Sequence, residues 1–273
     1  LLFDEPWLRY LVQYPKIWLD MPNTWERRKS QKVNDLPKTI DKDNYPNYYL
    51  RNFHHQTDGY LSDFSASIYD LQVDILFNGT ANSMRRRILK PLKEGLKNFN
   101  DRKNSSIKIL DVATGSGRTL KQLRGAFPKE KILGLDLSDS YLKEASRHIS
   151  DLDGDLIELI KGNAEDLPFE DNSLQAVSCV YLFHELPRTI REKVLKEFLR
   201  VLEPGGTLVL ADSIQIIDSP NFISIMEGFY KNFHEPFYCD YIKDNIDSKM
   251  EEIGFNNIES KSFFMTKVWS AIK

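Results

Sequence analysis

The chain has 273 residues, of which 41% are hydrophobic and 28% are charged, and its formal net charge is −3. This composition fits a globular enzyme with one large domain and an accessory segment, and it disfavours a nucleic-acid partner, which requires a basic surface. No run approaches the ~20 apolar residues of a membrane-spanning helix. We therefore expect a small-molecule enzyme without a membrane span, and composition leaves its oligomeric state open.

Cysteine content and the N-terminal sequence bear on location. Cys179 and Cys239 are too few for a disulfide framework, and Cys179 lies inside an apolar run typical of a buried strand. The N-terminus lacks the charged-then-apolar order of a signal peptide. We expect an intracellular, cytoplasmic protein.

The first hundred residues differ in composition from the rest. They open with an aromatic arm that contains three tryptophans, Trp7, Trp18 and Trp25. The acids of this arm, Asp20 among them, argue against a basic helix lying on a membrane, so we expect it to pack on its own domain. Residues 26–44 are rich in Lys, Arg and Asp and predict an exposed loop.

A polar loop over residues 52–62, with His54, His55 and Tyr60, then leads into an amphipathic helix that Ser62 or Asp63 caps. Two interpretations stay open. The segment forms a lid or pocket wall, which we favour, or it is a helix pair that only shields a sheet. Residues 81–96 predict a mainly helical stretch, which Pro91 should kink or interrupt, and the Arg85 to Arg87 run predicts a solvated face.

From residue 107 onward, apolar strands alternate with helices, as in a parallel α/β sheet. Thr189 and Glu192 form a capping-box pattern at the start of one helix. The strands are expected near residues 107–112, 131–136, 156–161, 175–181 and 206–211, with a terminal pair at 257–264 and 266–272.

The first of these strands ends in a glycine-bearing turn. Gly115 and Gly117 let the backbone approach a ligand closely, and the amides that open the next helix, from Arg118, would point at it. The third glycine of a dinucleotide fingerprint is missing, so NAD is the weaker choice. Asp136 ends the next strand, about 20 residues past the turn, where an acid binds both hydroxyls of a ribose. The pattern predicts a nucleoside cofactor.

Four segments in this order resemble motifs of the class I S-adenosylmethionine-dependent methyltransferases, in particular the ubiquinone and menaquinone C-methyltransferases. The segments are residues 111–117, 134–138, 162–169 and 200–206. The resemblance implies a Rossmann-like seven-stranded sheet in a cofactor-binding domain over residues 101–273. It also implies that residues 1–100 form the aromatic arm and a helical cover over the cofactor.

Carried over by position, the resemblance implies that Asp111 and residues 113–117 hold the methionine part of S-adenosylmethionine. Asp136 would hold the ribose, and Asn163 and Ala164 would frame the adenine. A sulfonium cation is also attracted to aromatic ring faces. The full set of expected cofactor residues is Asp111, Ala113, Thr114, Gly115, Ser116, Gly117, Asp136, Leu137, Asn163, Ala164, Tyr181 and Tyr60.

Histidines fall in segments expected near the cleft. His184 follows the fourth strand, and His54 and His55 lie in the N-terminal loop. An imidazole is a natural acceptor for the proton of a phenol, enol, carboxylic acid or activated ring carbon, so these three are the candidate catalytic residues. Each could instead be a hydrogen-bonded wall residue. No metal site is evident from the sequence, because the histidines and acids lack the compact ligand spacing of the familiar zinc type.

The predicted function is methylation of a small, fairly apolar acceptor at a ring, hydroxyl or carboxylate, by in-line transfer in a closed pocket. Aromatic residues of the insert after the fifth strand, including Phe229 and Tyr238, could line that pocket. The alternative is a non-catalytic S-adenosylmethionine-binding sensor or partner subunit. Methylation of RNA or protein is disfavoured by the net charge.

Overall fold

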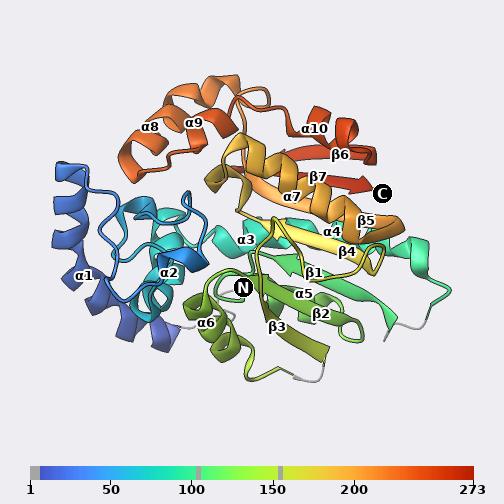
Figure 1. The fold of residues 1–273 in the computed structure, drawn as a ribbon, viewed down its shortest axis with the longest axis horizontal. Coiled ribbons are helices and arrows are strands. Elements are labelled where there is room, and N and C mark those ends of the chain that lie inside the picture. The colour runs from blue at the N-terminus through green and yellow to red at the C-terminus, as the bar shows by residue number, and fades with distance from the viewer. Residues whose placement is uncertain (1–6, 103–105, 153–155) are drawn as a thin grey trace.

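The computed structural model describes residues 7–102, 106–152 and 156–273. Its centre is a seven-stranded sheet in the order β3-β2-β1-β4-β5-β7-β6 (Figure 1). Strands β1 to β5 run parallel, and β7 runs antiparallel to both of its neighbours. The predicted class I sheet is confirmed. Its strands are β1 (Lys108–Val112), β2 (Lys131–Asp136), β3 (Ile157–Lys161), β4 (Leu174–Val180), β5 (Leu202–Ser213), β6 (Asn256–Phe263) and β7 (Thr266–Ile272).

The central strands are mainly apolar because helices cover both faces of the sheet. Every residue of β4 is buried, and so are four of the five residues of β1. Strand order reverses between β1 and β4, and this is the position where open parallel sheets bind ligands, beyond their carboxyl ends. The fold therefore predicts a site past Val112 and Val180.

Two apolar clusters hold the helices on the sheet. One joins α7 and α10 to one face, for example through Phe198 and Met250, and the other joins α4 and α5 to the opposite face through Leu92 and Leu120. The helices that follow the sheet strands are α5 (Arg118–Ala126), α6 (Asp139–Ile149), α7 (Arg188–Val201) and α10 (Ile246–Ile253). Short 3₁₀ turns at η4 (Leu96–Phe99) and η7 (Phe183–Glu185) border the sheet at its two ends.

A second group of helices lies at one end of the sheet. In Figure 1, α1 (Trp7–Ser30) and α2 (Asp63–Leu76) lie at the left, with α8 (Ile223–Phe233) and α9 (Tyr238–Tyr241) above them. Helix α1 packs on α2, with Tyr10 and Ile17 against Ile68 and Leu71. Ser62 caps α2 as expected, since its side chain accepts a hydrogen bond from the Ser65 amide. The remaining short elements are η1 (Lys42–Asn44), η2 (Phe53–His55) and η8 (Pro220–Phe222).

The predicted loop over residues 26–44 is wrong at its start, because α1 continues to Ser30. Three basic residues, Arg27 to Lys29, occupy the last turn, where positive charge complements the helix dipole. Arg27 is buried and donates a hydrogen bond from Nε to the His55 carbonyl oxygen at 2.9 Å. A tertiary contact therefore extends the helix through a polar sequence.

One further prediction about a helix is wrong. The capping box of α7 does not form: the helix begins after Pro187 without a side-chain cap, and Glu192 pairs with Lys249 of α10 instead. The predicted helical stretch over residues 81–96 is present and interrupted, but the interruptions fall before Pro91 and divide it into three pieces. These pieces are α3 (Ala81–Arg85), η3 (Arg86–Ile88) and α4 (Leu89–Gly95).

The Arg85 to Arg87 run is not a uniformly solvated face. Arg85 is buried, and the Arg87 guanidinium lies over the Phe263 ring, 4.6 Å from its centroid. Only Arg86 and Arg87 remain open to solvent. Among the described helices, none has the length and apolarity needed to cross a membrane.

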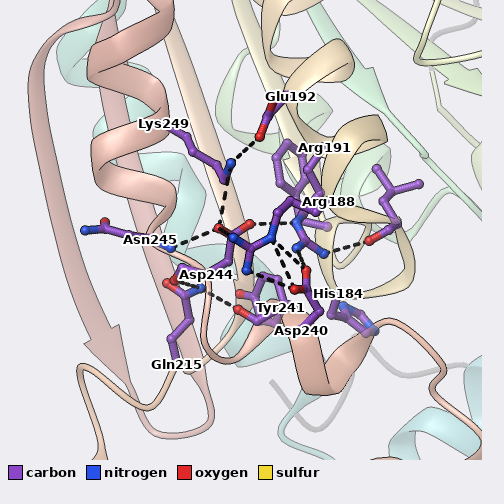
Figure 2. Close-up of polar contacts among 12 residues, drawn as sticks. His184, Arg188, Arg191, Glu192, Gln215, Asp240, Tyr241, Asp244, Asn245 and Lys249 are labelled. Carbon is purple, nitrogen blue, oxygen red and sulfur yellow. Dashed lines mark hydrogen bonds and ion pairs between the residues drawn. The ribbon is translucent and has the colours of Figure 1, made fainter.

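A buried ion pair joins α7 to the segment that precedes α10 (Figure 2). Arg191 is fully buried, donates from Nε to Asp244 at 2.9 Å and from Nη1 to the Leu186 carbonyl oxygen at 2.7 Å. Arg188 lies nearby but is about half exposed. The two arginines therefore share Asp244 as a partner but differ in how far they are buried.

We predict that Arg191→Ala lowers the free energy of unfolding by about 3 to 5 kcal/mol, because it leaves the Asp244 carboxylate buried without its main partner. Arg188→Ala is the matched control and should cost less than about 1 kcal/mol. Equilibrium urea unfolding measures both. Equal losses in the two variants would contradict the burial argument.

Candidate active site

The turn between β1 and α5 has a backbone that favours glycine. Ala113, Gly115 and Gly117 all have positive φ, at 56°, 56° and 83°. A Cβ at Gly117 would lie 3.0 Å from Ala145, so α6 packs directly against the turn. At Gly115 the space is open, with the Tyr141 ring 4.0 Å away. The turn therefore presents bare backbone toward the space beyond the sheet.

Asp111 supports this turn from behind. Its carboxylate accepts hydrogen bonds from Thr114 Oγ1 at 2.8 Å and from Ser178 Oγ of β4 at 2.7 Å. Burial raises the pKa of Asp111 to about 7. Neither Asp111 nor Gly117 lines the adjoining cavity, so these two predicted cofactor residues lie in its supporting wall.

Asp136 ends β2 and faces the same cavity. Its two oxygens accept hydrogen bonds from the Gly115 amide at 2.8 Å and the Ser138 amide at 2.9 Å. Burial raises its pKa to about 6, although these amides favour the charged form. Asp136 thus joins the turn to β2 and still offers a carboxylate to a ligand.

The cofactor cavity, as we name the hollow in front of this turn, gathers residues from four strand ends and from the N-terminal segment. Asn163 and Ala164 enter from the loop after β3, and Asn163 Oδ1 accepts a hydrogen bond from the Glu165 amide at 3.0 Å. The predicted cofactor residues that line it are Ala113, Thr114, Gly115, Ser116, Asp136, Leu137, Asn163, Ala164, Tyr181 and Tyr60.

Aromatic rings cover one side of the cofactor cavity. Tyr60 stacks on Phe53 with ring centroids 5.3 Å apart and lies edge-on to Tyr69 and Tyr141 at 5.9 and 5.5 Å. Sequence reasoning found Tyr60 but missed Tyr69, Tyr141 and Tyr49, which also line the cavity. Tyr69 lies about one helical turn after Ser65 and Ala66, on the same buried side of α2. This helical spacing is the one sequence signal that could have indicated Tyr69.

The acceptor cavity, as we name the second hollow, has a volume of about 440 Å³ and lies between α1, α2, α3 and α8. Its lining is mainly apolar and includes Trp18, Met21, Val73, Met84, Phe229 and Tyr238. The two cavities share Tyr69, Arg85 and Tyr181, which form the junction between them. Sequence reasoning assigned Arg85 to the surface and so missed it.

His184 lines the acceptor cavity from the end of β4. Its Nδ1 lies 2.7 Å from Asp212 Oδ1, and the other Asp212 oxygen accepts a hydrogen bond from the Phe183 amide at 2.7 Å. Burial alone would lower the pKa of His184, but the Asp212 carboxylate outweighs it and raises the pKa to about 9. Asp212 therefore fixes the ring and leaves Nε2 for a ligand.

The two histidines of the N-terminal loop separate. His54 lines the acceptor cavity, and its Nε2 lies 3.0 Å from the Tyr60 hydroxyl. Burial opposes charge on His54, yet Glu235 and Glu185 raise its pKa to about 10. His55 lines neither cavity; its ring lies 5.6 Å from that of His234, and burial lowers its pKa to about 4.

The cofactor cavity fits S-adenosylmethionine by the chemistry of its lining. Asp136 offers a carboxylate to a pair of hydroxyls, and the turn at Gly115 offers backbone without a side chain in the way. The tyrosine rings suit a cationic sulfonium.

Comparison with known proteins agrees with this chemistry. A family model described as a methyltransferase domain matches residues 109–206. The demethylmenaquinone methyltransferase of Thermotoga maritima is 31% identical over 177 residues, which cover 65% of this chain and 70% of that protein. The one from Bacillus cereus is 33% identical over 127 residues, covering 46% of this chain and only about half (51%) of the relative.

The fold extends the comparison to the N-terminal segment. Human N-acetylserotonin methyltransferase, solved in complex with S-adenosylmethionine, superimposes with a TM-score of 0.61 over 94% of this chain and 68% of that chain. The sequence identity is 13%, so this likeness concerns the fold alone. The identity to the Thermotoga maritima relative shows that the chain belongs to the class I S-adenosylmethionine-dependent methyltransferases and is an enzyme with S-adenosylmethionine as its cofactor, and the matched methyltransferase domain and the fold agree with this.

Proposed function

We propose that the enzyme methylates a small, fairly apolar acceptor at a ring carbon, hydroxyl or carboxylate that can lose a proton. The observation that carries this proposal is the acceptor cavity, an apolar hollow of about 440 Å³ that adjoins the cofactor cavity and contains His184. The relatives named above are demethylmenaquinone methyltransferases, and a quinone ring in its reduced, quinol form is an acceptor of this kind.

S-adenosylmethionine supplies an electrophilic methyl group on a positively charged sulfur. In the proposed arrangement, Asp136 accepts hydrogen bonds from the ribose hydroxyls, and Asn163 and Ala164 frame the adenine. Residues 113–117 hold the methionine part, with Asp111 supporting them through Thr114. Tyr60 and Tyr181 present ring faces to the sulfonium.

Residues 1–100 are proposed to act as a cover, and residues 101–273 as the cofactor-binding domain. Tyr60 and Tyr69 contribute to the wall of the cofactor cavity, and α1 contributes Trp18 and Met21 to the wall of the acceptor cavity. Methyl transfer is an in-line displacement, so its rate depends on holding the acceptor atom behind the methyl group in a space without water. The cover would provide that closure.

His184 is the proposed proton acceptor, and it acts in the neutral form that prevails above its pKa of about 9. Its Nδ1 is engaged by Asp212, so Nε2 is the atom free to take a proton from the acceptor, and Asp212 would stabilise the imidazolium that forms. His55 has no place in this proposal because it reaches neither cavity. Methylation of RNA keeps little support, since Arg85 is buried and only Arg86 and Arg87 of that run face solvent.

The first prediction here concerns the cofactor. Asp136→Ala should weaken S-adenosylmethionine binding about ten- to a hundred-fold, because hydrogen bonds to a charged group contribute roughly 1.5 to 3 kcal/mol. Asp139→Ala is the control, since Asp139 is exposed and pairs with Lys161. Calorimetric titration measures both affinities, and unchanged binding in the Asp136 variant would reject the ribose role.

The second prediction concerns the base. His184→Gln should lower kcat by about 10² to 10⁴ while the affinity for S-adenosylmethionine stays unchanged, because the residue lines only the acceptor cavity. Transfer of a labelled methyl group to a panel of quinols, phenols and carboxylic acids measures kcat. A variant as active as the wild type on its best acceptor would remove His184 from the mechanism.

The third prediction tests which cavity holds the acceptor. Val73 lines the acceptor cavity and not the cofactor cavity, so the larger side chain of Val73→Trp should fill part of the space in which acceptors are proposed to bind. We expect KM to rise at least about ten-fold for large acceptors and less for small ones, with cofactor affinity preserved. Steady-state kinetics on acceptors of graded size decides this, and equal KM values in both proteins would place the acceptor elsewhere.

A further inference from the structure

Three side chains from distant parts of the sequence meet beside the junction of the two cavities. His54 comes from η2, Glu185 from η7, and Glu235 from the turn after α8. His54 Nδ1 lies 3.0 Å from Glu235 Oε1, and its Nε2 lies 3.5 Å from Glu185 Oε1. One nitrogen or oxygen atom from each residue can be chosen so that all three lie within 4.8 Å of one another. This spacing suits ligands around one ion.

Glu235 has one polar partner among the described residues, the His54 imidazole, and shares it with Glu185. Its side chain is fully buried, and apart from the ion-pair contact with His54, no donor among the described residues reaches either oxygen in hydrogen-bond geometry. A buried carboxylate with so few donors is costly. Glu185 also accepts a hydrogen bond from the Tyr60 hydroxyl, so Glu235 is the carboxylate that lacks donors. A dication in place of the proton on His54 would balance both negative charges.

The backbone of His54 gives a second indication. Its φ is 56°, in the left-handed region that a histidine seldom adopts, and such conformations gather at functional sites. The strained backbone directs the ring between Glu185 and Glu235 instead of into solvent. His54 also lines the acceptor cavity, and Glu185 lines the cofactor cavity, so an ion held here would border both.

We propose that His54, Glu185 and Glu235 bind a divalent transition-metal ion of the manganese-to-zinc series, and that this ion holds an oxygen atom of the acceptor. One imidazole nitrogen with two carboxylates suits these ions better than Mg²⁺, which prefers oxygen ligands and keeps several waters. Three protein ligands leave coordination positions open for a substrate.

The role of the ion, though not its binding, rests on the proposed function. The ion draws electron density from a bound acceptor hydroxyl, and the proton of that hydroxyl passes to His184. His184 lies beside the proposed ion, because its Nε2 is 3.9 Å from Oε1 of the ligand Glu185. The acceptor oxygen, or a ring carbon conjugated with it, then forms the bond to the methyl carbon. The carbon–sulfur bond breaks, its electron pair stays on sulfur, and the proton leaves His184 to solvent.

The test is metal binding by the full chain after treatment with a chelator. Mn²⁺ is titrated and the free ion is followed by electron paramagnetic resonance. We expect one ion per chain, and at least ten-fold weaker binding in Glu235→Gln and in His54→Gln. Glu252→Gln, an exposed carboxylate of α10, is the matched control and should bind as the wild type does. Far-ultraviolet circular dichroism and thermal unfolding verify that each variant is folded, and Glu185→Gln replaces any variant that is not.

The outcomes separate the two proposals. Absence of saturable binding up to about 1 mM Mn²⁺, or equal binding in the ligand variants and the control, overturns the metal site. Methyl transfer at full rate in chelator-treated wild type overturns the role of the ion and leaves the proposed function standing. Stoichiometric binding that depends on His54 and Glu235, in a protein that methylates no acceptor, supports the site and counts against the proposed function.

Discussion

Carboxylates buried at the ends of the parallel strands organise the rest of the site. Asp136 joins the turn after β1 to the end of β2 through the Gly115 and Ser138 amides. Asp212, at the end of β5, accepts from the Phe183 amide and fixes His184. A carboxylate in an apolar interior is stable only when donors surround it, so each of these charges requires the local backbone to keep one geometry. Since parallel strands end at a common edge, these fixed points lie close together.

The same edge also positions the N-terminal segment. Asp70 of α2 accepts hydrogen bonds from Ser116 Oγ at 2.5 Å and from Arg118 Nε at 3.1 Å, both belonging to the cofactor turn and its helix. Ser138 Oγ donates to the Tyr60 carbonyl oxygen at 2.7 Å. These buried contacts are polar and directional, so they specify one docking of α2 on the sheet more narrowly than apolar packing would. The turn proposed to hold the cofactor therefore also holds the wall that faces it.

The strands and the turn could be predicted from sequence because their signals are local. Apolar runs set most of the strands within a residue or two, although β5 begins four residues before its expected start, and Gly115 and Gly117 mark the turn. The predictions that failed concern residues whose positions depend on contacts between distant segments. Glu192 matches a capping box, but its partner is Lys249 on another helix. His54 and His55 are neighbours in the sequence, yet only His54 faces a cavity, and nothing in the sequence pairs it with Glu235.

In the proposed arrangement, the junction of the two cavities also restricts the acceptor. Arg85 is buried there, and among the described residues it donates a hydrogen bond from Nη1 to Asn82 Oδ1 at 3.1 Å, a neutral partner. A guanidinium with no carboxylate in direct contact repels a second cation more strongly in a buried cavity than in water. An acceptor that entered as an ammonium ion would approach both Arg85 and the cofactor's sulfonium. A neutral or anionic oxygen, or a ring activated by one, meets no such barrier, and for this reason hydroxyl, carboxylate and ring acceptors suit the cavity better than amines.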